Sequence, residues 1–94
     1  MKEELDKIKE KIATGKADEA IRLLGKLLAA RPERREAASA YYLLGNAHRK
    51  RGDWQQALNN YQEAIELDPD SPAAEARRMM MDILEFYNKD MFNQ

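Results

Sequence analysis

The sequence contains no cysteine and few of the other side chains that serve as nucleophiles or metal ligands. His48 is the only histidine, Thr14 is the only threonine, and Ser39 and Ser71 are the only serines. The lack of cysteine excludes disulfides, thiol catalysis and thiolate metal sites, and so few hydroxyl groups leave little from which to build a nucleophile and its base. The four glycines are isolated from one another, so there is no phosphate-binding glycine loop. We therefore predict that the chain is not an enzyme and has no catalytic residue, metal site or cofactor.

A strong net charge and a long apolar run are also missing. Sixteen basic and seventeen acidic residues leave a formal net charge of −1, which provides no long-range attraction to nucleic acid or anionic lipid. No apolar run approaches membrane-spanning length, and residues 1–7 lack the apolar core of a signal peptide. We expect a cytoplasmic protein that binds neither nucleic acid nor a membrane.

The most regular pattern in the chain lies between residues 40 and 69. On both sides of a break at Arg51-Gly52-Asp53, apolar or small residues recur in steps of three and four, which is helical spacing. Gly52 can end the first helix in the left-handed conformation, and Asp53 with Gln56 can begin the second as an N-cap. The pattern predicts a helical hairpin closed by Asp68-Pro69. The positions that carry it are Ala40, Tyr41, Leu44, Gly45 and His48, then Trp54, Ala57, Leu58, Tyr61, Ala64 and Ile65.

The remaining segments show similar periodicity. We predict a short helix over about 3–13, a break at 14–16, and a helix over 17–30 that stops at Arg31-Pro32 because the residue before proline disfavours helix. Residues 34–36 should lengthen the next helix by nearly one turn. Ser71 can cap the last helix with Pro72 in its first turn, and that helix should run to about Phe92. The markers of the first hairpin recur 37 residues later, as Gly15 and Gly52, Ala20 and Ala57, and Pro32 and Pro69.

These residues resemble the tetratricopeptide repeat, whose pattern occupies fixed positions along a helical hairpin. The resemblance implies an all-α, right-handed superhelix of five helices within one domain, residues 1–94. We expect repeat one at about 1–34, repeat two at about 38–71 and a long C-terminal capping helix at about 72–92. His48 stands where the family usually has an aromatic hydrocarbon, and we expect it to be packed with one ring nitrogen bonded. The matching positions are Tyr41, Leu44-Gly45, Gly52-Asp53-Trp54, Ala57-Leu58, Ala64-Ile65 and Asp68-Pro69.

The resemblance also implies a non-enzymatic protein-interaction scaffold, because the first helix of each family hairpin lines a concave groove for a peptide or protein. We favour a groove of mixed charge in which Tyr42 and Met79 supply apolar contacts. A clamp for a peptide carboxylate, built from lysine, asparagine and arginine, is disfavoured by Leu5, Asp82 and Glu85. A third alternative is that these positions are ordinary solvated surface. The predicted groove residues are Lys9, Tyr42, Asn46, Arg49, Lys50, Arg78 and Met79.

A rival hypothesis is self-association into a homo-oligomer. Residues 20–30 are apolar or small nearly all round, and Leu23 and Gly25 correspond to polar residues of the second repeat. Intrachain packing or neutral drift is an equal alternative explanation. The enrichment of residues 20–40 in alanine, leucine and arginine also raises the hypothesis of an engineered assembly. The predicted contact residues are Leu23, Gly25, Leu27, Ala29, Ala30, Met81, Phe86 and Phe92.

Overall fold

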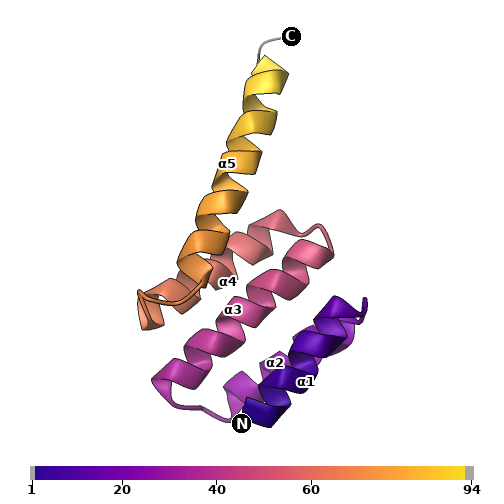
Figure 1. Cartoon of the computed structure of the whole chain (residues 1–94), viewed down its shortest axis with the longest axis vertical. Helices are drawn as coiled ribbons and strands as arrows, with labels where there is room; N and C mark the ends of the chain where they lie inside the picture. Colours follow the sequence, from indigo (N-terminus) through magenta and orange to yellow (C-terminus); the bar gives the residue numbers. More distant parts are fainter. Residues whose placement is uncertain (1, 93–94) are drawn as a thin grey trace.

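The structure, a computed structural model, describes residues 2–92, and for residues 87–92 it describes the backbone alone. This part of the chain forms two helical hairpins followed by a long helix (Figure 1). The all-α architecture expected from the sequence is therefore confirmed. The helices are α1 (Lys2–Ala13), α2 (Ala17–Ala29), α3 (Arg34–Lys50), α4 (Trp54–Leu67) and α5 (Ala73–Phe92).

Both hairpin turns contain a glycine in the left-handed region. Gly15 has φ 87° and Gly52 has φ 80°, and a side chain at either position would be strained. After Gly52, the carboxylate of Asp53 accepts a hydrogen bond from the backbone N–H of Gln56 at 3.3 Å. The predicted N-cap of α4 is thus confirmed, and the turn is fixed by these local interactions.

The additional turn at the start of α3 has a partner in the second repeat. The guanidinium Nε of Arg34 donates a hydrogen bond to the backbone carbonyl of Leu67 at 2.9 Å. The last carbonyls of a helix have no partner within that helix, so Arg34 satisfies one of them at the end of α4. Arg34, the first of the three additional residues, therefore links the first turn of α3 to the last turn of α4.

The core consists of two clusters that meet along α3. The first joins α1, α2 and α3 around the fully buried Leu24, and the second joins α4 and α5 around Tyr61 and Met80. Tyr41 and Tyr42 of α3 pack against both clusters. Because α3 contributes to each cluster, it is the central helix of the molecule.

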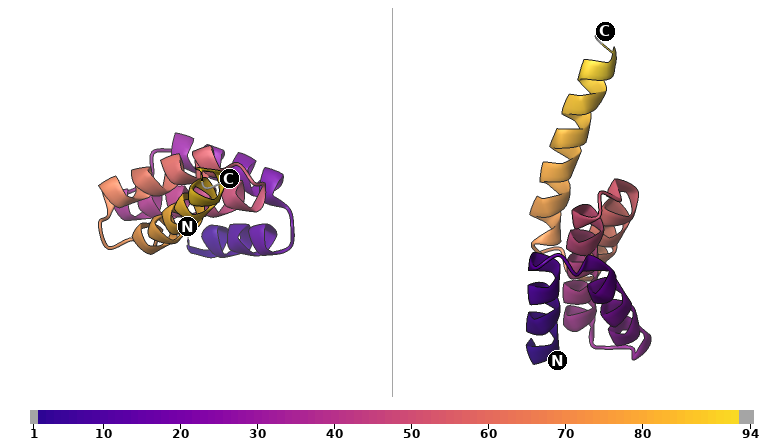
Figure 2. Two further views of the ribbon diagram at one scale, coloured as in Figure 1. Left: turned by 90° about the horizontal axis from the view of Figure 1, so that it is seen from above. Right: turned by 90° about the vertical axis from the view of Figure 1, so that its right-hand side faces the viewer.

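The fifth helix begins on α4 and then leaves it. The first half of α5 packs against α4, whereas the second half extends beyond the other four helices (Figure 2). The described molecule is correspondingly elongated, with extents of 48 × 28 × 17 Å. Part of an amphipathic helix is therefore left with an uncovered apolar surface.

Candidate peptide-binding groove

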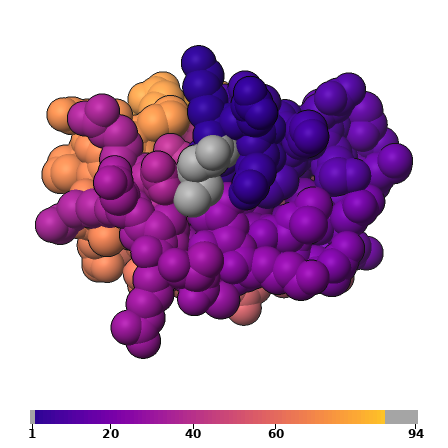
Figure 3. Space-filling view, turned by 90° about the horizontal axis from the view of Figure 1, so that it is seen from below, coloured from indigo at the N-terminus to yellow at the C-terminus, as the bar shows by residue number. Residues whose placement is uncertain are grey.

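A hollow of about 270 Å³ lies between α1, α3 and the loop that connects α4 to α5. Figure 3 shows this end of the molecule, with atoms of α1 beside those of α3 and of the first part of α5. The lining of the hollow combines apolar side chains with two lysines and two aspartates. We refer to this hollow as the concave groove. Its lining residues are Lys2, Leu5, Asp6, Lys9, Ala38, Ser39, Tyr42, Leu43, Asp68, Ser71 and Pro72.

Local hydrogen bonds fix the loop that closes one end of the concave groove. The carboxylate of Asp68 accepts a bond from the N–H of Asp70 at 3.0 Å, and Oγ of the buried Ser71 accepts one from the N–H of Ala73 at 3.1 Å. The Ser71 bond confirms the predicted cap of α5. This wall of the groove is therefore held by a turn and a helix cap rather than by long side chains.

Tyr42 lies between the concave groove and the core. Its ring is half-buried, and its centroid is 6.1 Å from that of Tyr61 at an interplanar angle of 37°. Such a tilted aromatic pair is favourable and restricts the ring. Tyr42 therefore presents a fixed apolar surface to the concave groove.

The structure brings only part of the predicted groove together. Among the residues described, Lys9 and Tyr42 line the concave groove, whereas the other five predicted residues do not. Arg49 and Lys50 are exposed at the end of α3, and Met79 is exposed on α5. Asn46 accepts a hydrogen bond from the hydroxyl of Tyr61 at 2.5 Å, so its amide oxygen already has a partner within the chain.

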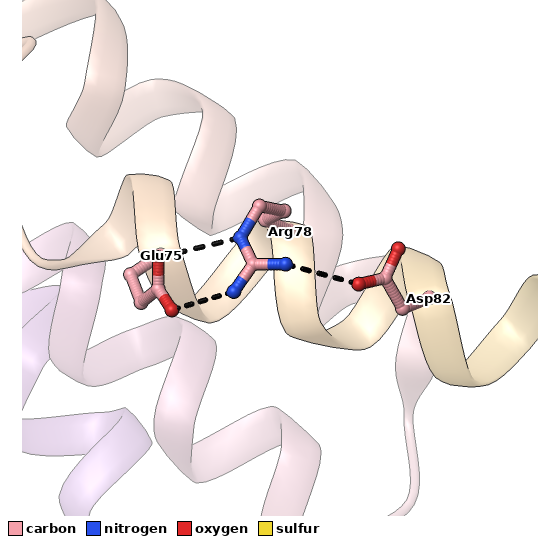
Figure 4. A network of polar contacts seen from close by, with 3 residues as sticks. All are labelled: Glu75, Arg78 and Asp82. Carbon is pink, nitrogen blue, oxygen red and sulfur yellow. Dashed lines mark hydrogen bonds and ion pairs between the residues drawn. The ribbon is translucent and has the colours of Figure 1, made fainter.

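Arg78 also has partners within its own helix. Its guanidinium lies 2.7 Å from a carboxylate oxygen of Glu75 and 3.1 Å from one of Asp82 (Figure 4). The hydrogen bond and charge of Arg78 lower the pKa of the Glu75 carboxyl, and those of Glu75 raise the pKa of Arg78. A peptide carboxylate would have to displace both acids, so the predicted loose clamp of Lys9, Asn46, Arg49 and Arg78 is not ready to bind one.

The residues predicted for self-association fall on separate surfaces. Leu23, Leu27 and Ala30 line a second groove with α1, although Leu27 is only 7% exposed and belongs to the core. Gly25 and Ala29 are exposed on α2 outside this lining. Leu23, unexplained by the sequence, packs against the first core cluster. Met81 and Phe86 are exposed on α5, and the side chain of Phe92 lies outside the described residues.

Several residues of the concave groove were not anticipated from the sequence, among them Lys2, Asp6, Asp68 and Pro72. Lys2 and Asp6 precede Lys9 by seven and three residues, a helical spacing that places them on its face of α1. Asp68 and Pro72 flank the loop, and the motif Asp68-Pro69 marked only where a helix ends. The helical spacing in the sequence therefore already placed Lys2 and Asp6 beside Lys9. The approach of the loop to α1 could not be predicted in this way, because it depends on tertiary packing.

The single histidine, His48, is largely buried, but not all of its hydrogen-bonding groups have a partner. The His48 side chain is 14% exposed, and its buried Nδ1 has no hydrogen-bond partner; the Asp53 carboxylate, at 3.9 Å, is beyond bonding distance. Burial lowers the pKa of His48, the charge of Arg51 lowers it further, and Asp53 opposes the shift. The folded protein therefore favours the neutral imidazole.

We expect the free energy of unfolding to fall as the pH is lowered through the ordinary histidine pKa of about 6.5. The folded-state pKa is the lower of the two, so between them the unfolded chain binds more protons and stability increases with pH. Urea denaturation between pH 5 and pH 7.5 measures this change. On acidification, the free energy of unfolding should fall more steeply for the wild type than for His48→Gln, and the difference should be roughly that expected for one titrating group. Equal pH slopes in the two proteins would contradict this assignment.

Two further features can be checked directly in the described residues, namely grouped metal ligands and a membrane-spanning helix. Within residues 2–86, no three or more histidine, cysteine, aspartate or glutamate side chains are grouped so that they could hold a metal ion. No helix in the described part of the chain combines the length and apolar character needed to cross a bilayer.

Comparison with known proteins identifies the repeat. The family model for the tetratricopeptide repeat matches residues 38–71. The chain is also similar to the Bacteroides fragilis protein BF1650, solved by solution NMR, with 59% sequence identity and a TM-score of 0.84. That match covers 96% of this chain and 89% of the other. No curated protein matches the chain. This chain, with its two helical hairpins, belongs to the tetratricopeptide repeat family.

Proposed function

We propose that the protein is a non-enzymatic interaction module whose concave groove binds an extended segment of a partner protein. The observation that carries the proposal is the meeting of α1, α3 and the Asp68–Pro72 loop around Tyr42. Membership of the repeat family supports a role in protein interaction. The proposal replaces the predicted contact with Met79 by a contact with Leu5, which lines the groove.

The size and charge of the concave groove indicate what it can accept. At about 270 Å³ it is smaller than the roughly 300–1,000 Å³ of small-molecule sites, which suits one or two side chains of a peptide better than a whole ligand. Lys2 and Lys9 lie two turns apart on α1, and Asp6 and Asp68 add the opposite charge. We therefore propose a peptide with an apolar side chain against Tyr42 and charged groups of both signs beside it.

Binders from a library of random linear peptides provide the test. Lys9→Glu reverses a charge in the groove, and Ser39→Arg places a long side chain in it. We expect each variant to weaken the selected peptides at least about tenfold, or roughly 1.4 kcal/mol. Lys50→Glu is the matched control, because Lys50 is exposed on α3 outside the groove. The affinity of this variant for the selected peptides should stay within about twofold of the wild-type value.

Two results would refute this proposal. One is a library that yields no binder at all. The other is a set of binders whose affinity is unchanged by Ser39→Arg but reduced by Lys50→Glu, which would move the site to the end of α3. Circular dichroism of each variant establishes that the helices are retained.

A second candidate function is structural, with another copy of the chain as the partner. It is supported by the apolar side chains of Met79 and Ile83, which are 49% and 51% exposed and lie one turn apart on α5. Soluble proteins that expose several large apolar side chains together commonly use them in contacts. This function would use no residue of the concave groove.

A further inference from the structure

The helix α1 has a hollow on each of two faces. Residues 2, 5, 6 and 9 line the concave groove, and residues 4, 7, 8 and 11 line a hollow of about 400 Å³ between α1 and α2. Residues spaced by three and four share a face of a helix, so the two sets lie on different faces. Space therefore remains beside α1 both toward α3 and toward α2.

Between these two faces, a single apolar stripe attaches α1 to the rest of the fold. Ile8 and Ile12 are buried and lie one turn apart, and Leu5 on the same stripe is partly buried against the first core cluster. Most other side chains of α1 are exposed. These two buried residues of α1 compare with six in α3, so the apolar attachment of α1 is narrow.

Polar contacts add little to this attachment. Among the described residues, one side-chain ion pair joins α1 to another helix, from Lys11 to Glu19 at 3.0 Å, and its side chains are 30% and 42% exposed. Such a pair contributes little because water screens it. A helix of 12 residues is also marginal by itself in water. We therefore expect α1 to open at a lower free energy than the fold as a whole.

The concave groove is complete only while α1 is docked. Four of its eleven lining residues belong to α1, including both of its lysines. The wall formed by the Asp68–Pro72 loop is held by its own turn and helix cap, and Leu43 of the lining is buried in α3. Figure 1 and Figure 2 place α1 at the edge of the molecule, so no other described helix blocks its outward movement.

We propose that α1 is a hinged wall of the concave groove. It swings away as a unit about the turn at Thr14-Gly15-Lys16 and closes on a bound peptide. This inference rests on the proposed function and deepens it, because it names the element that admits the peptide and then holds it. The closed form alone binds the peptide fully, so the peptide and the docking of α1 stabilise each other. The apparent affinity then depends on the fraction of molecules in which α1 is docked.

Hydrogen exchange of backbone amides, followed by NMR, tests the opening. In the free protein, the amides of residues 8–13 should have protection factors at least about tenfold below the highest values in α3, because they exchange by local opening. A saturating selected peptide should raise the protection of both helices by the same factor, since neither the open nor the unfolded chain binds it. Equal protection of α1 and α3 in the free protein would overturn the hinge. A rise in α3 without one in α1 would overturn closure on the peptide.

Ile12→Ala tests the coupling without touching the groove. Ile12 is 6% exposed and lines neither hollow, so its truncation weakens the docking of α1 alone. The affinity of this variant for the selected peptides should fall at least about threefold, as the open form becomes populated. Leu58→Ala is the matched control, because it truncates an aliphatic side chain of α4 that packs on the second core cluster. The affinity of the control should stay within about twofold of the wild-type value.

A milder variant covers the case in which Ile12→Ala does not fold. Ile12→Val removes one methylene group and should lower the protection of α1 roughly twofold to tenfold. Unchanged protection in Ile12→Val would overturn the attachment through Ile12. Unchanged affinity in Ile12→Ala, or an equal loss in Leu58→Ala, would overturn the coupling. A library without binders would refute the proposed function and closure on a peptide together, whereas exchange in the free protein would still decide whether α1 opens separately.

Discussion

Replacing Gly45 by alanine is expected to destabilise the protein by about 1–3 kcal/mol, although alanine favours helix over glycine by about 1 kcal/mol. A β-carbon at this position of α3 would lie 2.9 Å from Cζ of Tyr61 and closer still to two other ring carbons. The Tyr61 ring is fully buried, and its hydroxyl is bonded to Asn46, so it has little room to move aside. The thermal midpoint should fall by roughly 4–8 °C for each kcal/mol.

The same substitution at Gly25 is the matched control. Gly25 lies within α2, and a β-carbon there would have no neighbour within 4 Å. Gly25→Ala should therefore stabilise the protein by about 0.5–1 kcal/mol through helix propensity alone. Gly45→Ala and Gly25→Ala should thus differ in sign. If both raise the midpoint, the close packing of Tyr61 on α3 is wrong.

Truncating Leu24 to alanine is expected to destabilise the protein by about 2–5 kcal/mol. Leu24 is fully buried in the cluster that joins α1, α2 and α3, so the change removes apolar contacts and leaves a cavity. A chain of this length typically has a total stability of about 5–14 kcal/mol, so the loss would be a large fraction of it. Urea denaturation followed by circular dichroism would measure the change.

Leu28→Ala provides the comparison for Leu24→Ala. Leu28 is the same residue type one turn later on α2, but it is only partly buried against the cluster. Leu28→Ala should therefore lower the free energy of unfolding clearly less than Leu24→Ala does, because less apolar contact is lost and a smaller cavity remains. Equal losses in the two variants would show that the first cluster is not centred on Leu24.

The helices and their ends could be predicted because they depend on neighbouring residues. The three- and four-residue spacing of apolar positions indicated each helix, and Gly52, Asp53 and Ser71 marked ends that the structure confirms. These signals act within one or two turns of the chain. An amino-acid sequence shows them directly.

The groove was harder to predict because its residues are selected by contacts across the fold. Asn46 is hydrogen-bonded to Tyr61, which lies 15 residues further along the chain. No local sequence pattern predicts that pairing. Arg78 is a different case. Its partners Glu75 and Asp82 stand three residues before it and four after it, so the spacing already indicated an internal ion-pair network.

Tyr41 and Tyr42 pack against both core clusters, and this couples the stability of the two ends of the molecule. Repeat proteins are cooperative only as far as neighbouring units stabilise one another. Here the two core clusters share these two rings, so loosening of α1 and α2 removes support from α4 and α5 as well. A ligand that immobilises Tyr42 would bias both halves toward the folded state at once, which makes α3 the element of energetic coupling in this small solenoid.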